Sequence, residues 1–324
     1  MVGWSEQLTY SDLLSKVPTV ESLPVPGFTR YPSFRGIVLT PELDHQLFLL
    51  QPSCQVVVNQ KEINVLADTA RIIDEQADNK NRILIGHLAN YYLVLPKDSR
   101  VLEMPVTQAW FNNLELVAKL AARQDAIQIR GGRHVGRSVV PTGILNSSSA
   151  HIDGDYDERA DQIDLVLIKT ALDHPEIFLD ATCRGFQLVM AFLLNKLPEE
   201  IPNHRSAPGE PETRHRVRNV VTELYGPYAP GALLTLQNFV VNSYHMQGFL
   251  LKAMMPYLDF LREVYGIYIT HVSEDGVVEL AIRIDATGEA TGLLKQFHPE
   301  KMDDEPVGNM IINYNRDRIR NLMR

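Results

Sequence analysis

The sequence predicts an α/β fold, a three-layer sandwich in which helices cover both faces of a mostly parallel central sheet. Apolar runs typical of buried strands alternate with segments of helical period, as expected for a parallel sheet covered on both faces. With 324 residues, 45% of them hydrophobic and 22% charged, the chain is long enough to bury a large core. Around Cys183, an apolar strand, a sharp turn and a helix follow one another directly.

The first hundred residues begin with an extended, proline-containing lead over residues 18–32. A strand, an amphipathic helix and a second strand are then expected, at residues 55–59, 62–76 and 82–85. No linker composition separates this part from the rest. We therefore expect a single domain over residues 1–324, with residues 1–104 extending or elaborating its sheet.

The rest of the chain continues the alternation. A helix, a strand and a final docked helix are expected at residues 112–123, 126–130 and 310–324. The stretch 198–218 contains three prolines and many charges, so we predict a surface loop that covers the neighbourhood of the site.

The formal net charge of -9 provides no electrostatic footprint for nucleic acid or an anionic membrane, so neither partner is expected. The first residues lack the pattern of a secretory signal, and no apolar run reaches membrane-spanning length. The two cysteines, Cys54 and Cys183, do not make a disulfide framework. We expect a cytoplasmic protein, although export by a dedicated secretion route would leave the same sequence pattern.

Cys183 is the candidate nucleophile. A cysteine on a sharp strand-to-helix turn projects its sulfur outward, and the helix N-terminus favours the reactive thiolate. The small residues Ala181 and Gly185 flank it, as a tight elbow requires. A free cysteine is more often a buried small hydrophobe, so this alternative has to be weighed against a catalytic role.

A second element, residues 296–300, shifts the balance toward catalysis. It follows the apolar pair Leu293 and Leu294 and contains His298 at a strand end, with Glu300 two residues further. A thiol nucleophile needs a base within hydrogen-bond reach and a third group that orients the base. Cys183, His298 and Glu300 are residues of these three types.

These motifs resemble the class I glutamine amidotransferase superfamily and, within it, the peptidase C26 group, whose bacterial members include gamma-glutamyl-GABA hydrolase. The resemblance rests on the elbow Cys-Arg-Gly-x-Gln and on Gln-Phe-His-Pro-Glu. Further segments similar to the group's, in the same order, lie at residues 127–135, 161–172, 241–247 and 274–279. The similarity extends from about residue 105 to 305 and implies a flavodoxin-like fold, with residues 1–104 divergent.

The resemblance also implies hydrolysis of a gamma-glutamyl amide, a small-molecule substrate, through a thioester. The backbone N–H groups of Gly132 and Arg184 would form the oxyanion hole. The residues expected to contact the substrate are Gly131, Gln187, His245 and Gln247. No cofactor is expected, and a homodimer stays open.

Three departures from the group's pattern bear on the substrate. The group usually has glycine at Ala181, aspartate at His134 and histidine at Met246. The expectation is therefore a gamma-glutamyl amide hydrolase rather than an enzyme for gamma-glutamyl-GABA itself. His245 is as readily an ordinary loop or core residue, and His215 as readily part of a solvated strand edge.

Other functions remain open. The chain could be a glutaminase subunit that delivers ammonia to a partner synthetase, a protein with a different cysteine chemistry on the same elbow, or a binding or effector protein that has lost turnover. A metal site in the acidic run 151–158 is rejected, because the run lacks the central glycine and the closing glutamate of a calcium loop.

Overall fold

The computed structural model describes residues 83–86, 100–103, 114–122, 124–129, 131–132, 134–140, 156, 158–206, 212–302 and 306–322. Several sequence predictions lie outside these residues. They are the proline-containing lead, the strand 55–59, the helix 62–76, Cys54 and most of the acidic run that begins at residue 151.

Within these residues, nine strands form one sheet in the order β2-β1-β3-β4-β11-β10-β9-β6-β7. Their bounds are Ile83–Gly86 (β1), Arg100–Glu103 (β2), Ala126–Ile129 (β3), Phe178–Thr182 (β4), Thr213–Asn219 (β6), Phe239–Ser243 (β7), Ile267–Ser273 (β9), Val278–Ile284 (β10) and Ala290–Lys295 (β11). The short strands Glu199–Glu200 (β5) and Gln247–Gly248 (β8) pair with each other. The expected strands at residues 82–85 and 126–130 correspond to β1 and β3.

The sheet is mixed, so the prediction of a mostly parallel sheet was wrong for half of it. The pairings from β2 to β11 are parallel. Those from β11 to β7 are antiparallel. For two of these pairings the physical reason is the length of the connections: only a few residues separate β9 from β10 and β10 from β11. A parallel pairing needs a crossover of a dozen or more residues.

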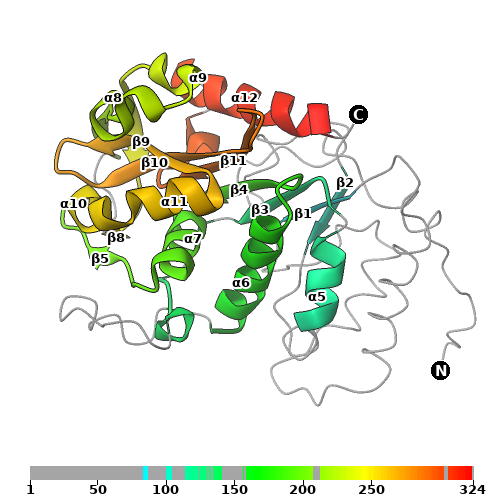
Figure 1. The fold of residues 1–324 in the computed structure, drawn as a ribbon. Helices are drawn as coiled ribbons and strands as arrows, with labels where there is room; N and C mark the ends of the chain where they lie inside the picture. The colour runs from blue at the N-terminus through cyan, green and yellow to red at the C-terminus, as the bar shows by residue number, and fades with distance from the viewer. Residues whose placement is uncertain are drawn as a thin grey trace, which may run out of the picture.

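Helices cover both faces of the sheet, as predicted. Figure 1 shows α5, α6 and α7 on one face and α12 on the opposite face. These helices span Leu114–Ala121 (α5), Glu158–Asp173 (α6), Arg184–Leu194 (α7) and Pro306–Leu322 (α12). The remaining helices are Val221–Tyr225 (α8), Gly231–Leu234 (α9), Leu251–Met254 (α10) and Leu258–Tyr265 (α11). The mixed α/β architecture is consistent with the fold that the resemblance implies.

The stretch 198–218 differs from the predicted surface loop. Residues 213–218 belong to β6, an interior strand that pairs with both β7 and β9. His204, in the segment before it, is buried. The charged residues of β6 alternate with His215 and Val217, so one side of the strand faces the protein interior.

Two buried ionic groups join the layers. Lys295 on β11 pairs with Asp180 on β4, and Asp180 also accepts hydrogen bonds from Gln128 on β3 (2.8 Å) and Asn315 on α12 (3.1 Å). On the other face, the Arg184 guanidinium of α7 binds two carboxylates of α6, those of Asp161 and Asp164. Both groups are buried, and the Asp180 group connects segments that are far apart in the sequence.

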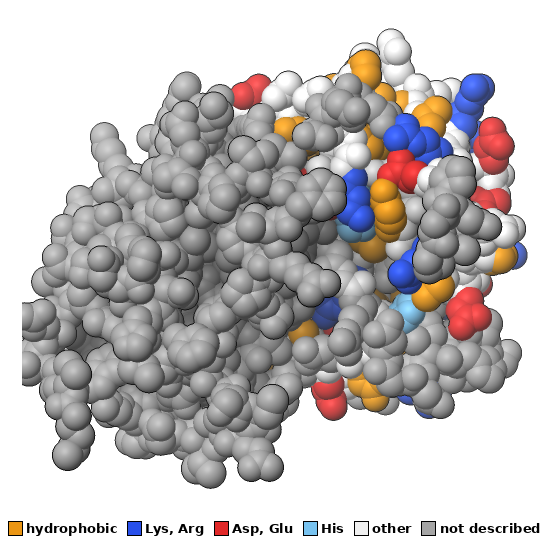
Figure 2. Space-filling model, turned by 180° about the vertical axis from the view of Figure 1, so that it is seen from behind, with side chains coloured by type: hydrophobic (Ala, Val, Ile, Leu, Met, Phe, Trp, Pro, Cys, Tyr) orange, Lys and Arg blue, Asp and Glu red, His pale blue; other side chains and the backbone are white. Residues whose placement is uncertain are grey.

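The surface is of mixed character. On the face shown in Figure 2, acidic, basic and hydrophobic side chains are interspersed over the described part. Among the described residues, no helix has the length and apolar character needed to cross a bilayer.

The Asp180 network yields a stability prediction. Asp180→Ala should leave the buried Lys295 ammonium without its carboxylate and destabilise the protein by roughly 3–5 kcal/mol. The double variant Asp180→Leu, Lys295→Met should recover much of this loss, because it removes both charges together. Urea unfolding followed by circular dichroism measures both effects. A single variant that unfolds at the wild-type urea midpoint would contradict this account.

Candidate functional site

The predicted elbow is present, and Cys183 occupies its turn. β4 ends at Thr182 and α7 begins at Arg184, so Cys183 is the residue that caps the helix. Its backbone has φ 53° and ψ -111°, a conformation that non-glycine residues rarely adopt. The Cys183 N–H donates a hydrogen bond of 2.6 Å to the Lys295 carbonyl oxygen of β11. The strained turn is therefore attached to the neighbouring strand.

Glycine is required at position 185, as predicted. A Cβ there would lie 2.3 Å from the Ile129 carbonyl oxygen of β3, closer than such atoms approach in proteins. Any larger residue would push α7 away from the sheet and displace the elbow.

His298 and Glu300 lie beside the elbow because β11 runs parallel to β4. Lys295, at the end of β11, pairs with Thr182, so the carboxyl ends of both strands meet at one edge. The His298 Nδ1 atom lies 2.6 Å from Glu300 Oε1, and a hydrogen bond connects His298 with the Cys183 side chain. The structure thus brings the three predicted residues together.

The charges of this group favour a thiolate next to an imidazolium. Burial acts to raise the pKa of Cys183, but the charge and hydrogen bond of His298, together with the charge of His245 and the backbone N–H of Arg184, outweigh it, and the pKa of the thiol is lowered. Burial acts to lower the pKa of His298, but Glu300 and Cys183 raise it to about 10. A thiolate held in this way can attack a carbonyl carbon, and the imidazolium can donate a proton.

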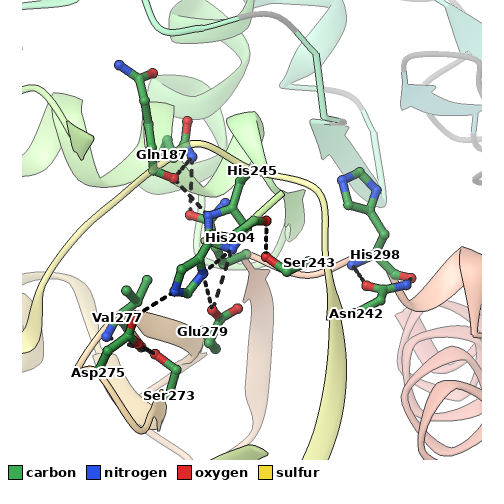
Figure 3. A network of polar contacts seen from close by, with 12 residues as sticks. Gln187, His204, Asn242, Ser243, His245, Ser273, Asp275, Val277, Glu279 and His298 are labelled. Atoms are coloured by element: carbon green, nitrogen blue, oxygen red, sulfur yellow. Dashed lines mark hydrogen bonds and ion pairs between the residues drawn. The ribbon is translucent and has the colours of Figure 1, made fainter. Parts of the chain in front are cut away.

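Asn242 was not singled out from the sequence, although it lies in the segment 241–247 that carries the resemblance. Its side-chain oxygen accepts a hydrogen bond from the His298 N–H, and its Nδ2 donates to the His298 carbonyl oxygen, both at 2.9 Å (Figure 3). The ring of Tyr244 packs edge-on against the His298 ring. These contacts hold the His298 loop from the side of β7.

The two expected oxyanion-hole residues are neighbours. A Cβ on Gly132 would lie 3.2 Å from the Arg184 Cδ atom, and the Arg184 backbone N–H hydrogen-bonds to the Cys183 side chain. Gly131 precedes Gly132 and is partly exposed. The guanidinium of Arg184 is engaged by α6, so only the backbone of this residue is directed toward the sulfur.

Gln187 and Gln247 are two of the residues expected to contact the substrate. In the structure, a hydrogen bond joins the Gln187 side chain to the backbone of Gln247. The Gln187 amide nitrogen donates to the Gln247 carbonyl oxygen (2.6 Å) and to Gln296 Oε1 (3.3 Å). The Gln247 side-chain oxygen lies 3.1 Å from His134 Nδ1. These contacts connect β8 with α7 and with the loop after β3. Contact with a substrate stays a prediction for both residues.

His245 lies in a different group of side chains. It is buried, and its neighbours are His204 and Glu279 (Figure 3), together with His215. Burial acts to lower its pKa, but Glu279 outweighs this and raises the pKa of His245. His215 faces this group from an interior strand, so the alternative of a solvated strand edge was wrong. The four residues are spaced closely enough to hold a metal ion.

The pKa shifts predict how Cys183 alkylation depends on pH. In the wild type, the lowered pKa of Cys183 should keep the thiolate present below the usual thiol pKa of about 8.5. Glu300→Gln should lower the pKa of His298, weaken the charge that stabilises the thiolate, and shift the alkylation midpoint upward. Iodoacetamide labelling of the Cys183 peptide, followed by mass spectrometry across pH, measures the midpoint.

The matched control is Glu176→Gln, because Glu176 is exposed and pairs with His174 after α6. This control should keep the wild-type midpoint. Equal midpoints for the wild type and Glu300→Gln would refute the assignment of Glu300 as the group that charges His298.

Comparison with known proteins agrees with this geometry. The family model described as Peptidase C26 matches residues 75–300, more than two thirds of the chain. The match begins about thirty residues before the segment that carries the recognised motifs, and it includes β1 and β2. No match to a curated protein was found. The chain belongs to the Peptidase C26 family, within the class I glutamine amidotransferase-like proteins.

Proposed function

We propose that this protein is a cysteine hydrolase that cleaves a gamma-glutamyl amide bond through a thioester intermediate. Membership in the Peptidase C26 family implies gamma-glutamyl hydrolase-type activity. The observation that carries the proposal is the hydrogen-bonded chain from Glu300 through His298 to the Cys183 side chain on a strained elbow. This arrangement unites a nucleophile, an acid–base group and an orienting carboxylate.

In the first half of the reaction, the Cys183 thiolate attacks the carbonyl carbon of the gamma-glutamyl amide. The backbone N–H groups of Arg184 and Gly132 stabilise the negative oxygen of the tetrahedral intermediate. The C–N bond then breaks, and the His298 imidazolium donates its proton to the leaving amine. The products of this half are a thioester on Cys183, a free amine and a neutral imidazole.

In the second half, the neutral His298 takes a proton from a water molecule, whose oxygen attacks the thioester carbonyl carbon. The C–S bond breaks, which restores the thiolate beside an imidazolium. The glutamyl acid leaves and ionises in solution. Glu300, hydrogen-bonded to Nδ1, holds the ring in one orientation and stabilises its charge in both halves.

The amine portion of the substrate is set by the surroundings of the triad. His134 and Met246 occupy positions where the resemblance leads us to expect aspartate and histidine. His134 contacts Gln247, and the Met246 side chain is exposed. Because these residues differ from the group's pattern, we propose a gamma-glutamyl amide whose amine is not gamma-aminobutyrate.

The test is glutamate release from a panel of gamma-glutamyl amides, with glutamine and gamma-glutamyl-GABA included. Cys183→Ala and His298→Gln should each reduce kcat by several orders of magnitude, and Glu300→Gln by roughly 10⁴-fold or somewhat less, since it removes the orienting group. His174→Gln is the matched histidine control, because His174 lies after α6 and its ring pairs with the exposed carboxylate of Glu176 there. It should keep wild-type activity.

The outcomes separate the alternatives. Turnover of glutamine alone, and only with a partner synthetase present, would replace the proposal with the ammonia-delivering glutaminase subunit. No turnover of any amide, with Cys183 readily alkylated, would favour another acyl substrate or an effector. Activity that survives Cys183→Ala would refute the proposed nucleophile.

A further inference from the structure

Four side chains from four segments, three of them buried and one partly exposed, converge beside the proposed active site. We call them the histidine–glutamate cluster: His204 after β5, His215 on β6, His245 between β7 and β8, and Glu279 on β10. His204, His245 and Glu279 are each at most 3% exposed. None of the four belongs to the triad. The proposed hydrolysis gives no role to His204, His215 or Glu279, and gives His245 only the expected contact with the substrate.

The spacing of the potential ligand atoms fits one metal ion. His204 Nδ1 and His245 Nε2 are 3.3 Å apart. Glu279 Oε1 lies 3.5 Å from His245 Nε2 and 3.8 Å from His204 Nδ1. Ligand atoms bound tetrahedrally to zinc at about 2.0–2.1 Å are separated by about 3.3–3.4 Å. One ligand atom of His215 completes the set, and all four atoms lie within 4.8 Å of one another.

The outer nitrogens of two rings are already engaged, as in known metal sites. His204 Nε2 lies 2.8 Å from Asp275 Oδ2, and His245 Nδ1 lies 3.0 Å from the Gln247 carbonyl oxygen. Such partners fix the ring so that the outer nitrogen carries the proton. With the proton there, the inner nitrogen of each neutral ring would have a lone pair directed at the centre of the cluster, whereas the 3.3 Å contact between the two inner nitrogens without a metal needs a proton on one of them.

Two members of the cluster lack hydrogen bonds. Both carboxylate oxygens of Glu279 and the Nε2 atom of His215 are buried without a hydrogen-bond partner among the described residues. A fully buried carboxylate is costly unless a cation or good hydrogen bonds compensate it. A bound divalent cation would provide a positive charge and ligate these atoms. The alternative to a bound cation is that His245 carries an extra proton and provides the positive charge beside Glu279.

We propose that the histidine–glutamate cluster binds one four-coordinate divalent transition-metal ion, with zinc as the best fit. Three imidazole nitrogens and one carboxylate match zinc chemistry, whereas magnesium and calcium require oxygen ligands. With four protein ligands the site is closed, so the metal has a structural role. It would tie β6, β10 and the segment of Gln247 together behind α7.

The test uses the full chain with Cys183→Ala, so that zinc cannot bind to the thiolate of the triad. After chelation, the protein is dialysed against zinc or magnesium chloride, and bound metal is measured by mass spectrometry. We expect about one zinc per chain and no magnesium. Adding Glu279→Gln or His215→Gln should abolish retention, and Asp275→Asn should weaken zinc affinity roughly 10–100-fold.

The matched control adds His271→Gln to the same background. His271 is also a buried histidine, but it hydrogen-bonds to Gln237 and Thr270, outside the cluster. This variant should retain zinc like its Cys183→Ala parent. Failure of the parent to hold zinc, or equal retention by the ligand variants and the control, would overturn the proposal in favour of a protonated His245.

A second measurement needs no change within the cluster. In the Cys183→Ala protein, Co²⁺ should give the intense visible absorption of a tetrahedral site, and Tm should rise with zinc concentration. A weak octahedral cobalt spectrum together with an unchanged Tm would also refute the site.

Discussion

The parallel pairing of β4 with β11 is the constraint on which the proposed active site depends. It places Thr182 beside Lys295, and the Cys183 N–H bonds directly to the Lys295 carbonyl oxygen. Through this pairing, the nucleophile turn and the His298 loop, more than a hundred residues apart in sequence, lie at one edge of the sheet. The buried Asp180–Lys295 pair joins the same two strands, so the ionic network and the backbone pairing enforce one register.

The strained elbow is stabilised from two sides. Gly185 lets α7 approach β3, and the Arg184 guanidinium fixes the first turn of α7 to α6 through two carboxylates. The backbone conformation of Cys183 costs on the order of 1–3 kcal/mol, which these surrounding contacts have to offset. Because the Arg184 guanidinium is held in buried ion pairs with α6, the side chain points away from the sulfur. Only the backbone N–H of Arg184 is directed toward it.

Local patterns predicted which segments come together at the elbow, but they did not predict the antiparallel half of the sheet. The elbow and the His298–Glu300 pair are readable because their geometry follows from a few consecutive residues. Residues 213–218 looked like a loop because they carry many charges. Arg214, Arg216 and Arg218 alternate with inward-facing positions, and since one of these is a histidine, the period-two pattern of a strand is hard to recognise. Asn242 could not be assigned a role, because its reciprocal bonds to His298 exist only after β7 lies next to the final loop.

The same cause hid the histidine–glutamate cluster. The spacing of its ligands in the sequence is not that of a metal-site motif. The antiparallel pairing of β10, β9, β6 and β7 brings them together in the fold. The two halves of the sheet therefore carry different chemistry: the parallel half presents the nucleophile, and the antiparallel half encloses the cluster. They meet at the segment 245–247, where Gln247 contacts both Gln187 and His134. A metal that fixes His245 would thereby fix a wall of the proposed substrate site.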